Sequence, residues 1–431
     1  MSAALAYPSF RVVWLASFGS NIGSWMQNVA LGAFAFRLTG SSAFGAQLGL
    51  AQMAPQLVFA SVGGVLADSR DRVRVMQATQ IGTMLMCAFL TFEVRAADPS
   101  RTLLLATAVG LGICNSLNGP VFNSLLPNLV ERRDLGGVIA LMSTQMNLAR
   151  VVGPAIGGLL TPRIDVWGVF AINTGSFLLL IIVLFLLRIP PSARRAVQSG
   201  VVVALRSRLL GGFSVVRRDV LVRRLMITMS LFSLFSLSFL TLMPMIGTRN
   251  LAMNTKTLAY GLLYAAFGFG AAGGAIVVGT VFAGKETVRF APAGFAIFAV
   301  MLAVFGSTHS RPVAYAIAPL LGLAYFGTVT CLSTCLQLHL DDAVRGRVMA
   351  VWMMAFGGLI PFGSLLGAWV ADHRSVSLTT SIGAAVTLGL ALLAHRWWGR
   401  GRPLTPARPA RSSASGAKAS ALQAGAVQRD A

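Results

Sequence analysis

One arginine stands where a charge is costly. Arg150 lies near the middle of an apolar segment, residues 136–160, that is long enough to cross a bilayer. A charge at that depth costs on the order of 2.5–3.5 kcal/mol on insertion scales. Ser143 and Asn147 precede it at the spacing of one helical face. This pattern indicates either an anion-attracting or gating group in a translocation path, or an arginine held by helix-end carbonyls and neighbouring amides.

Polar stripes of the same kind run along other apolar segments. The first segment, 10–36, repeats serine and asparagine at helical spacing, and the fourth, 102–126, carries Asn115 and Asn118. In lipid such groups need partners, so these faces are expected to turn inward to a cavity. The residues that we expect to line this cavity are Asn21, Gln27, Asn115, Asn118, Asn147 and Arg150.

The composition indicates a membrane protein. Hydrophobic residues make up 55% of the 431 residues and charged residues 11%, against roughly 25% charged in soluble domains. The net charge of +22 is spread over short basic clusters between apolar runs, which argues against a nucleic-acid-binding domain. All four cysteines lie inside apolar segments and are expected to be buried small hydrophobic residues, so we expect neither disulfides nor a metal site. No enzyme activity and no cofactor are predicted.

Segments of about 20 apolar residues predict membrane-spanning helices. Basic residues number 26 on one set of alternate connections and 8 on the other, with Arg150 completing the 35. This asymmetry predicts an even number of spans with both termini in the cytoplasm. Twelve segments qualify: 10–36, 43–66, 75–94, 102–126, 136–160, 166–187, 224–247, 257–282, 289–307, 313–337, 347–370 and 376–395.

The chain also shows signs of duplication. A shift of 210 residues places Gly63-Gly64 on Gly273-Gly274, and the same shift aligns Gly153 with Gly363. We therefore predict an all-α membrane protein of twelve helices in two pseudo-symmetric halves. The expected divisions are a first half at 1–187, a basic cytoplasmic linker at 188–223, a second half at 224–398 and a disordered cytoplasmic tail at 399–431.

A basic hairpin between the second and third segments carries a family resemblance. An apolar run ends at a paired glycine, an acid follows, and three arginines come within five residues. This stretch resembles the signature loop of the major facilitator superfamily, although Ser69 and Asp71 depart from its usual pattern. The resemblance implies a conformational latch made by Gly64, Asp68 and Arg72; the alternative is a plain basic loop on the cytoplasmic side.

Further blocks resemble a bacterial branch of that superfamily, the enterobactin exporters and transmembrane secretion effectors. They are residues 25–30, 126–130, 147–158 and 345–348, and the likeness runs from about residue 8 to 374. Within 147–158, Gly153, Pro154, Gly157 and Gly158 are similar to the antiporter motif of drug exporters. Physically, the glycines permit close helix approach and the proline frees a carbonyl, so ordinary small-residue packing is the alternative.

The resemblance implies a secondary active transporter in the bacterial inner membrane. Its expected partners are membrane lipid, protons as the coupling ion, and a drug-like, siderophore-like or anionic small molecule exported by alternating access. None of the 13 acids lies at the centre of a predicted span, and only Asp68 and Glu93 lie near the expected path. Proton antiport therefore rests on the resemblance. An uptake facilitator of the same fold and a non-transporting accessory protein are the alternatives.

Overall fold

Every regular element is a helix in the part of the chain that the structure, a computed structural model, describes, which is residues 2–186, 212–282 and 286–399. The α-helices are α1 (Ser2–Leu5), α2 (Pro8–Thr39), α3 (Ser42–Ser69), α4 (Arg72–Arg95), α5 (Arg101–Leu125), α6 (Leu135–Leu186), α8 (Val220–Leu231), α9 (Phe239–Met245), α10 (Leu258–Thr280), α11 (Ala291–Ser307), α12 (Arg311–His339), α13 (Asp342–Met353), α14 (Ile360–His373) and α15 (Val376–Trp398). Short helical turns join several of them: η1 (Leu126–Asn128), η2 (Arg132–Asp134), η3 (Phe232–Ser236), η4 (Ile246–Asn250), η5 (Thr287–Phe290) and η6 (Met354–Gly358).

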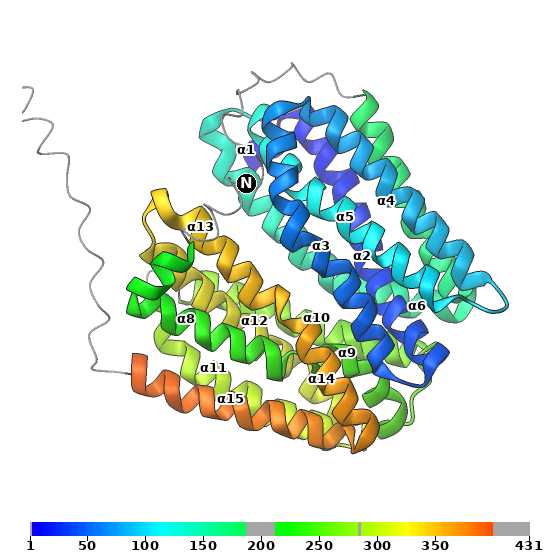
Figure 1. Cartoon of the computed structure of the whole chain (residues 1–431), viewed down its shortest axis with the longest axis vertical. Coiled ribbons are helices and arrows are strands. Elements are labelled where there is room, and N and C mark those ends of the chain that lie inside the picture. Colours follow the sequence, from blue (N-terminus) through cyan, green and yellow to red (C-terminus); the bar gives the residue numbers. More distant parts are fainter. Residues whose placement is uncertain (1, 187–211, 283–285, 400–431) are drawn as a thin grey trace, which may run out of the picture.

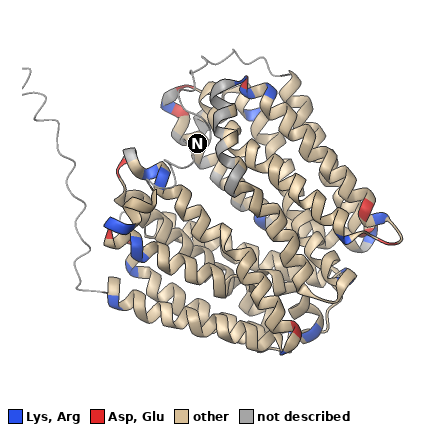
Figure 2. Ribbon diagram, viewed as in Figure 1, with Lys and Arg blue, Asp and Glu red and all other residues tan. Residues whose placement is uncertain are grey.

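The chain is a multi-pass membrane protein. Within the described residues, nine helical stretches are long and apolar enough to cross a bilayer, and each overlaps a predicted span. The other three predicted spans are helical too, in α2, α3 and the first part of α6, but they are not among the nine. In α2 the polar stripe lowers the hydropathy. Charged residues gather at the ends of the helices, as Figure 2 shows.

The helices form two bundles. Figure 1 shows α1 to α6 together in a first bundle and α8 to α15 together in a second, with the two ribbons converging at one end and lying far apart at the other. Aromatic packing fills the second bundle, where the Phe232 ring lies 5.1 Å from Phe295 and 5.0 Å from Phe298. The first bundle instead has two separate apolar clusters, one around Phe10 and one around Phe170.

A sharp break divides α6. Asp165 has φ 56° and ψ 180° inside an otherwise helical stretch, a backbone conformation that is unfavourable for a residue with a side chain. Its carboxylate accepts a hydrogen bond from the amide of Val166, the first residue beyond the break, at 2.8 Å. The predicted spans 136–160 and 166–187 are therefore the two arms of α6.

Glycine contacts between helices recur in the two bundles. A methyl group added to Gly153 of α6 would lie 2.8 Å from the carbonyl oxygen of Ile22 in α2. In the second bundle, one added to Gly363 of α14 would lie 1.8 Å from the carbonyl oxygen of Leu234 in η3. The glycines are 210 positions apart in the sequence and their partners 212.

The paired-glycine regions show a similar contact one position off this register, since Gly273, 210 residues after Gly63, has no neighbour within 4 Å of an added methyl group. Gly63 of α3 packs on the backbone of Leu117 in α5, where an added methyl group would lie 2.8 Å from the carbonyl oxygen. Gly274 of α10 packs in the same way on Leu323 of α12, at 2.3 Å. These contacts need glycine because the neighbouring atoms belong to backbone and cannot move aside. The predicted offset of 210 residues thus relates the contacts of Gly153 and Gly363, whereas at the paired glycines the similar contacts, of Gly63 and Gly274, are 211 residues apart.

An Asp–His pair holds the start of the second bundle. Asp219 caps α8, since its Oδ1 accepts the amides of Leu221 at 2.8 Å and Val222 at 3.1 Å. Its Oδ2 lies 2.8 Å from Nε2 of His339 at the end of α12. Burial by itself would raise the pKa of Asp219, but the hydrogen bonds from His339 and the two amides outweigh it and lower the pKa.

Replacing this acid is expected to weaken the second bundle. Asp219→Ala removes a helix cap, which typically costs about 1 kcal/mol of stability. Because the folded pKa lies below the unfolded value, the wild-type contribution is present above the usual aspartate range and is lost as pH falls through the folded pKa. Thermal unfolding of the purified protein over an acidic pH series measures both effects.

Asp341→Ala is the matched control, because Asp341 precedes α13 in the same position but its side chain makes no capping hydrogen bond. Equal losses of stability in the two variants, or a loss for Asp219→Ala that does not shrink at low pH, contradict this role of Asp219.

Candidate transport site between the two bundles

Arg150 lies where the bundles meet. It projects from the first arm of α6, and its guanidinium carbon lies 4.9 Å from the ring centre of Trp25 in α2. On the other side it lies 4.3 Å from the ring centre of Phe326 in α12, which belongs to the second bundle. A flat cation over an aromatic face is stabilised by roughly 0.5–2 kcal/mol, most strongly where water is excluded. One charged group therefore contacts aromatic rings of both bundles at mid-span.

Three of the expected cavity residues share a polar cavity of about 570 Å³. Asn21 of α2 and the pair Asn115 and Asn118 of α5 line it, together with residues of α4 and α6. The cavity lies inside the first bundle, between the two apolar clusters, which accounts for the split core. Other polar groups on its wall are Ser17, Ser20, Ser24, Gln80 and Asn123.

Gln27 lies elsewhere. It is buried, and its Oε1 accepts a hydrogen bond of 2.7 Å from Nδ2 of Asn173 in the second arm of α6. This amide pair fastens α2 to α6 within the first bundle, and Gln27 is not among the residues on the polar cavity. Asn173 was not among the predicted residues, although an asparagine in the middle of the span 166–187 is a signal of the same kind as Asn21.

Glu93 has a local partner. This carboxylate, at the end of α4, is buried and accepts the backbone N–H of Ser100 at 2.5 Å, just before α5 begins. Glu93 therefore gives a hydrogen-bond partner to the backbone of the short connection between α4 and α5. The side chains of Asp68, the other acid expected near the path, and of Asn147 lie outside the described part of the structure.

The hairpin after α3 is organised by two residues. Arg72 donates a hydrogen bond of 2.9 Å to the carbonyl oxygen of Ser124, in the last turn of α5, where a cation favours the helix dipole. Asp71 caps α4, because its Oδ1 accepts the amides of Val73 at 2.9 Å and Arg74 at 3.1 Å. The capping role of Asp71, a departure from the family loop, was not predicted, although an acid before a helical run is a typical cap.

The glycines of the antiporter-like motif, in the first arm of α6, have different neighbours. Gly158 meets Gly261 of α10 across the bundle interface, where an added methyl group would lie 2.2 Å from the Gly261 Cα. Gly157 faces Met26 of α2 at an ordinary 3.5 Å. Gly153, as described above, packs within the first bundle, and Pro154 beside it is buried. Of the four motif residues, Gly158 is thus the one that lets the two bundles touch backbone to backbone.

Polar contacts join the bundles at the end remote from the hairpin. Ser41, before α3, donates a hydrogen bond to Asp372 of α14. Arg249 of η4 lies 3.6 Å from Asp372 and donates to the carbonyl oxygen of Gly40 at 3.3 Å. Since α3 separates Ser41 from the hairpin by 28 helical residues, the two ends are about 40 Å apart.

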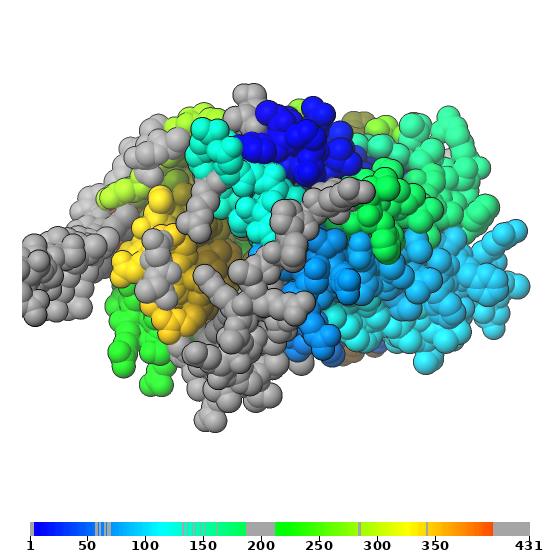
Figure 3. All heavy atoms as spheres, turned by 90° about the horizontal axis from the view of Figure 1, so that it is seen from above, coloured from blue at the N-terminus to red at the C-terminus, as the bar shows by residue number. Residues whose placement is uncertain are grey.

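A second ion pair supports the same end. Lys256 of the second bundle lies 3.2 Å from Asp165 at the break in α6. At the opposite end, Figure 3 shows the yellow residues of the α12–α13 region to one side of the blue and cyan residues of the first bundle. The described inter-bundle ion pairs thus hold one end of the molecule.

Asp372→Asn is expected to loosen this closed end. The amide keeps the shape of the side chain but removes the charge that attracts Arg249, and a partly exposed pair of this kind contributes about 1 kcal/mol or less. We expect a several-fold faster reaction of a cysteine placed at Ser42, which is buried beside this contact, with a membrane-impermeant thiol reagent. Glu131→Gln, which breaks an exposed pair within the first bundle, is the control. Equal reaction rates in wild type, Asp372→Asn and the control would contradict the role of Asp372 in holding this end closed.

A family model described as transmembrane secretion effector matches residues 1–400. The chain belongs to this family of the major facilitator superfamily. The Enterobactin exporter EntS of Salmonella typhimurium is 28% identical to this transmembrane secretion effector over 419 residues, covering 91% of this chain and 93% of that protein. The Staphyloferrin A transporter of Staphylococcus aureus is 22% identical over 382 residues, covering 86% and 92%. These similarities identify a transporter rather than an enzyme.

Solved structures share the fold. The nucleoside transporter NupG superposes with a TM-score of 0.72 at 11% identity, covering 90% of this chain and 99% of that one. A bacterial homologue of the lysosomal transporter Spinster, in an inward-facing and unoccupied conformation, gives 0.65 at 15% identity, covering 91% and 96%. At these identities the likeness concerns the fold alone.

Proposed function

We propose that this transmembrane secretion effector exports a siderophore-like or other anionic small molecule across the bacterial inner membrane by alternating access. The names of its relatives, an enterobactin exporter and a staphyloferrin A transporter, support the substrate class. The arginine that contacts both bundles carries the proposal, because a cation at mid-span would attract an anion into the path between them. Arg150 is its main residue, with Asn21, Asn115, Asn118 and Asn147 as further polar groups on the way.

The proposed architecture is twelve spans in two halves, 1–187 and 224–398, joined by the basic linker 188–223 and followed by the tail 399–431. The repeated glycine contacts support the duplication. The described part of the linker includes a helical segment at 212–218, whereas most of the linker and nearly all of the tail lie outside the described residues. The excess of basic residues on alternate connections supports an orientation with both termini in the cytoplasm.

On this orientation the structure corresponds to an inward-facing state. The end closed by Asp372 and Lys256 would face outward, and the end of the hairpin would face the cytoplasm. Transport then requires the hairpin end to close and the Asp372 end to open. Gly64, Asp68 and Arg72 would form the latch of the outward-facing state, with Arg72 already anchored on α5.

Proton antiport completes the proposal. Gly153, Pro154, Gly157 and Gly158 resemble the antiporter motif, and Gly158 sits where the bundles touch. An incoming proton would need an acid that changes partners during the cycle. Asp68 lies in the hairpin, and Asp372 lies at the closed end with Arg249 and Ser41. They stand at opposite ends of such a path, so each is a residue to replace when the coupling of efflux to protons is measured.

Efflux from an exporter-deficient bacterial strain tests the function. Cells expressing the chain are expected to release loaded enterobactin or staphyloferrin A faster than cells with an empty vector, and a protonophore is expected to slow the release. Intracellular accumulation of either compound driven by the chain would instead favour an uptake facilitator. No transport of these or a panel of anionic compounds would favour the accessory-protein alternative and contradict the proposal.

A further inference from the structure

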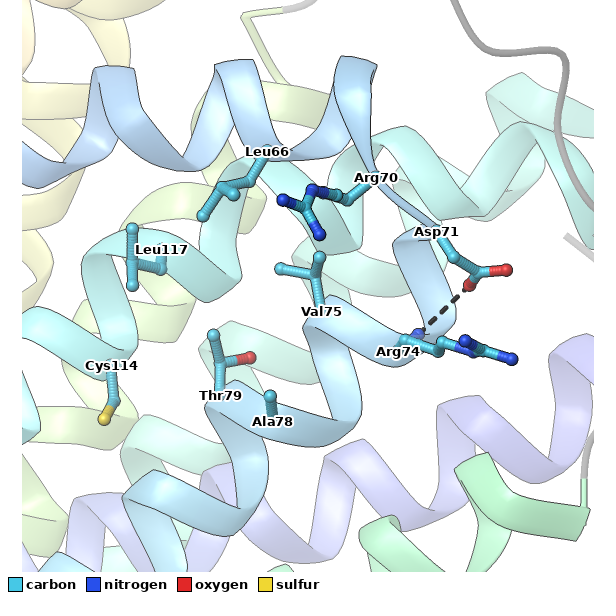
Figure 4. Close-up of a pocket in the computed structure, with 9 residues that line it drawn as sticks. All are labelled: Leu66, Arg70, Asp71, Arg74, Val75, Ala78, Thr79, Cys114 and Leu117. Atoms are coloured by element: carbon cyan, nitrogen blue, oxygen red, sulfur yellow. Dashed lines mark hydrogen bonds between the residues drawn. The ribbon is translucent and has the colours of Figure 1, made fainter.

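A hollow of about 690 Å³ lies beside the hairpin, between α3, α4 and α5 (Figure 4). Small residues close its far edges. Gly63 of α3 packs on Leu117 of α5, and Gly82 of α4 packs on Cys114 of α5, where an added methyl group would lie 2.9 Å from Sγ. Beyond these contacts the helices leave open space on the side of the basic hairpin. The hollow is separate from the polar cavity of about 570 Å³ and from Arg150.

Two arginines stand at the mouth of the hollow. Arg70 and Arg74 line it and are exposed. In Figure 4 the Arg70 side chain bends back over the hollow, whereas Arg74 turns outward beside Asp71. The Asp71 Oδ1 is occupied by the amides of α4, and Arg72 is directed to α5. Among the described side chains, no carboxylate pairs with Arg70 or Arg74, so both can meet an anion from outside.

The wall of the hollow is apolar and leads to the lipid. Its lining includes Leu66, Val75 and Ala78. Ala78 begins one face of α4 that continues, at helical spacing, through Leu85, Phe89 and Phe92, whose exposed fractions are 54%, 40% and 74%. Large apolar side chains exposed along a membrane span face hydrocarbon. The hollow therefore opens from basic groups at the membrane surface to a lipid-facing stripe.

We propose that this hollow binds an anionic phospholipid of the adjacent leaflet. Its phosphate would lie between Arg70 and Arg74, and an acyl chain would lie against the wall at Ala78 and continue along α4. Basic side chains at a membrane surface attract anionic headgroups. The apolar wall favours a ligand with an acyl chain, which a water-soluble anion lacks. The site is distinct from the proposed transport path, so its test does not depend on the transported substrate.

Native mass spectrometry of the purified full-length chain tests the site with three probes. These are phosphatidylglycerol, phosphatidylcholine with the same acyl chains, and glycerol 3-phosphate. We expect phosphatidylglycerol to bind about tenfold more tightly than phosphatidylcholine, and glycerol 3-phosphate not to bind at the lipid concentrations used. Equal binding of the two lipids overturns the proposal. Glycerol 3-phosphate binding as tightly as the lipid shows a soluble-phosphate site and overturns it too.

Two variants locate the binding. Arg70→Gln with Arg74→Gln is expected to abolish the preference for phosphatidylglycerol. Arg217→Gln with Arg218→Gln, an exposed arginine pair before α8, makes the same change in net charge and is expected to keep it. Ala78→Trp leaves both arginines in place but fills the hollow, and is expected to weaken phosphatidylglycerol binding by a similar factor. A preference that survives both the double arginine change and Ala78→Trp contradicts the assignment.

Discussion

Arg150→Ala is expected to reduce efflux at least about tenfold while the amount of protein in the membrane stays unchanged. The substitution removes a mid-span cation that lies against Trp25 of the first bundle and Phe326 of the second. Two such contacts with little water are together worth roughly 1–4 kcal/mol. Because burying the charge is itself costly, alanine at this position is compatible with insertion. The measurement is efflux of a transported compound, normalised to protein in the membrane fraction.

Arg150→Lys separates charge from shape. Lysine keeps the cation but lacks the flat guanidinium that stacks on both rings. If Arg150 attracts an anion, lysine should restore much of the efflux of anionic compounds, with a higher KM. If Arg150 mainly joins the bundles through its rings, lysine should resemble alanine for anionic and neutral compounds alike. Unchanged efflux in Arg150→Ala would contradict both roles.

Gly158→Ala is expected to have the second large effect. Its new methyl group would lie 2.2 Å from the Cα of Gly261, and backbone atoms cannot rotate away. The two helices must separate, and overpacking of this kind typically costs about 1–3 kcal/mol. Since α6 and α10 belong to different bundles, the strain falls on the contact between the bundles at the end held by Lys256 and Asp165. We expect efflux to fall more than tenfold and the thermal stability of the purified protein to drop.

Gly157→Ala is the matched control one residue away. Its methyl group would meet Met26 at 3.5 Å, an ordinary contact distance. We expect this variant to transport at nearly the wild-type rate and to unfold at the wild-type temperature. Equal effects of the two substitutions would mean that the glycine pair is not a special contact between the bundles.

Much of the fold followed from the length of the apolar runs. Long apolar runs must be helical in a bilayer because every backbone group needs an internal partner, and the predicted segments are helical where the structure describes them. The separation of the spans 136–160 and 166–187 was predicted, but the form of the break, at Asp165 inside a continuous helical stretch, was not. It depends on a strained backbone conformation held by contacts with Val166 and Lys256, and the partner in the second bundle is distant in sequence.

The candidate site was predictable in part. Arg150 was singled out because a charge inside the membrane has a high free-energy cost. Helical spacing pointed to the asparagines of α2 and α5 that share a cavity. Which ring or amide each polar group meets depends on helix rotation and on pairs far apart in sequence. The pairing of Gln27 with Asn173 and the contact of Arg150 with Phe326 are of this kind. Likewise, Gly157 and Gly158 look alike in the sequence but have very different neighbours.

Accumulation in inside-out membrane vesicles tests the central proposal most directly. Vesicles containing the wild-type chain, energised with a pH gradient, should accumulate labelled enterobactin or staphyloferrin A inside. Vesicles with Arg150→Ala and vesicles without the chain should not, whereas Gly157→Ala vesicles should behave as wild type. The proposal that this chain exports an anionic small molecule through a path containing Arg150 is contradicted if the Arg150→Ala vesicles accumulate the compound as fast as wild type, or if wild-type vesicles accumulate no more than empty ones.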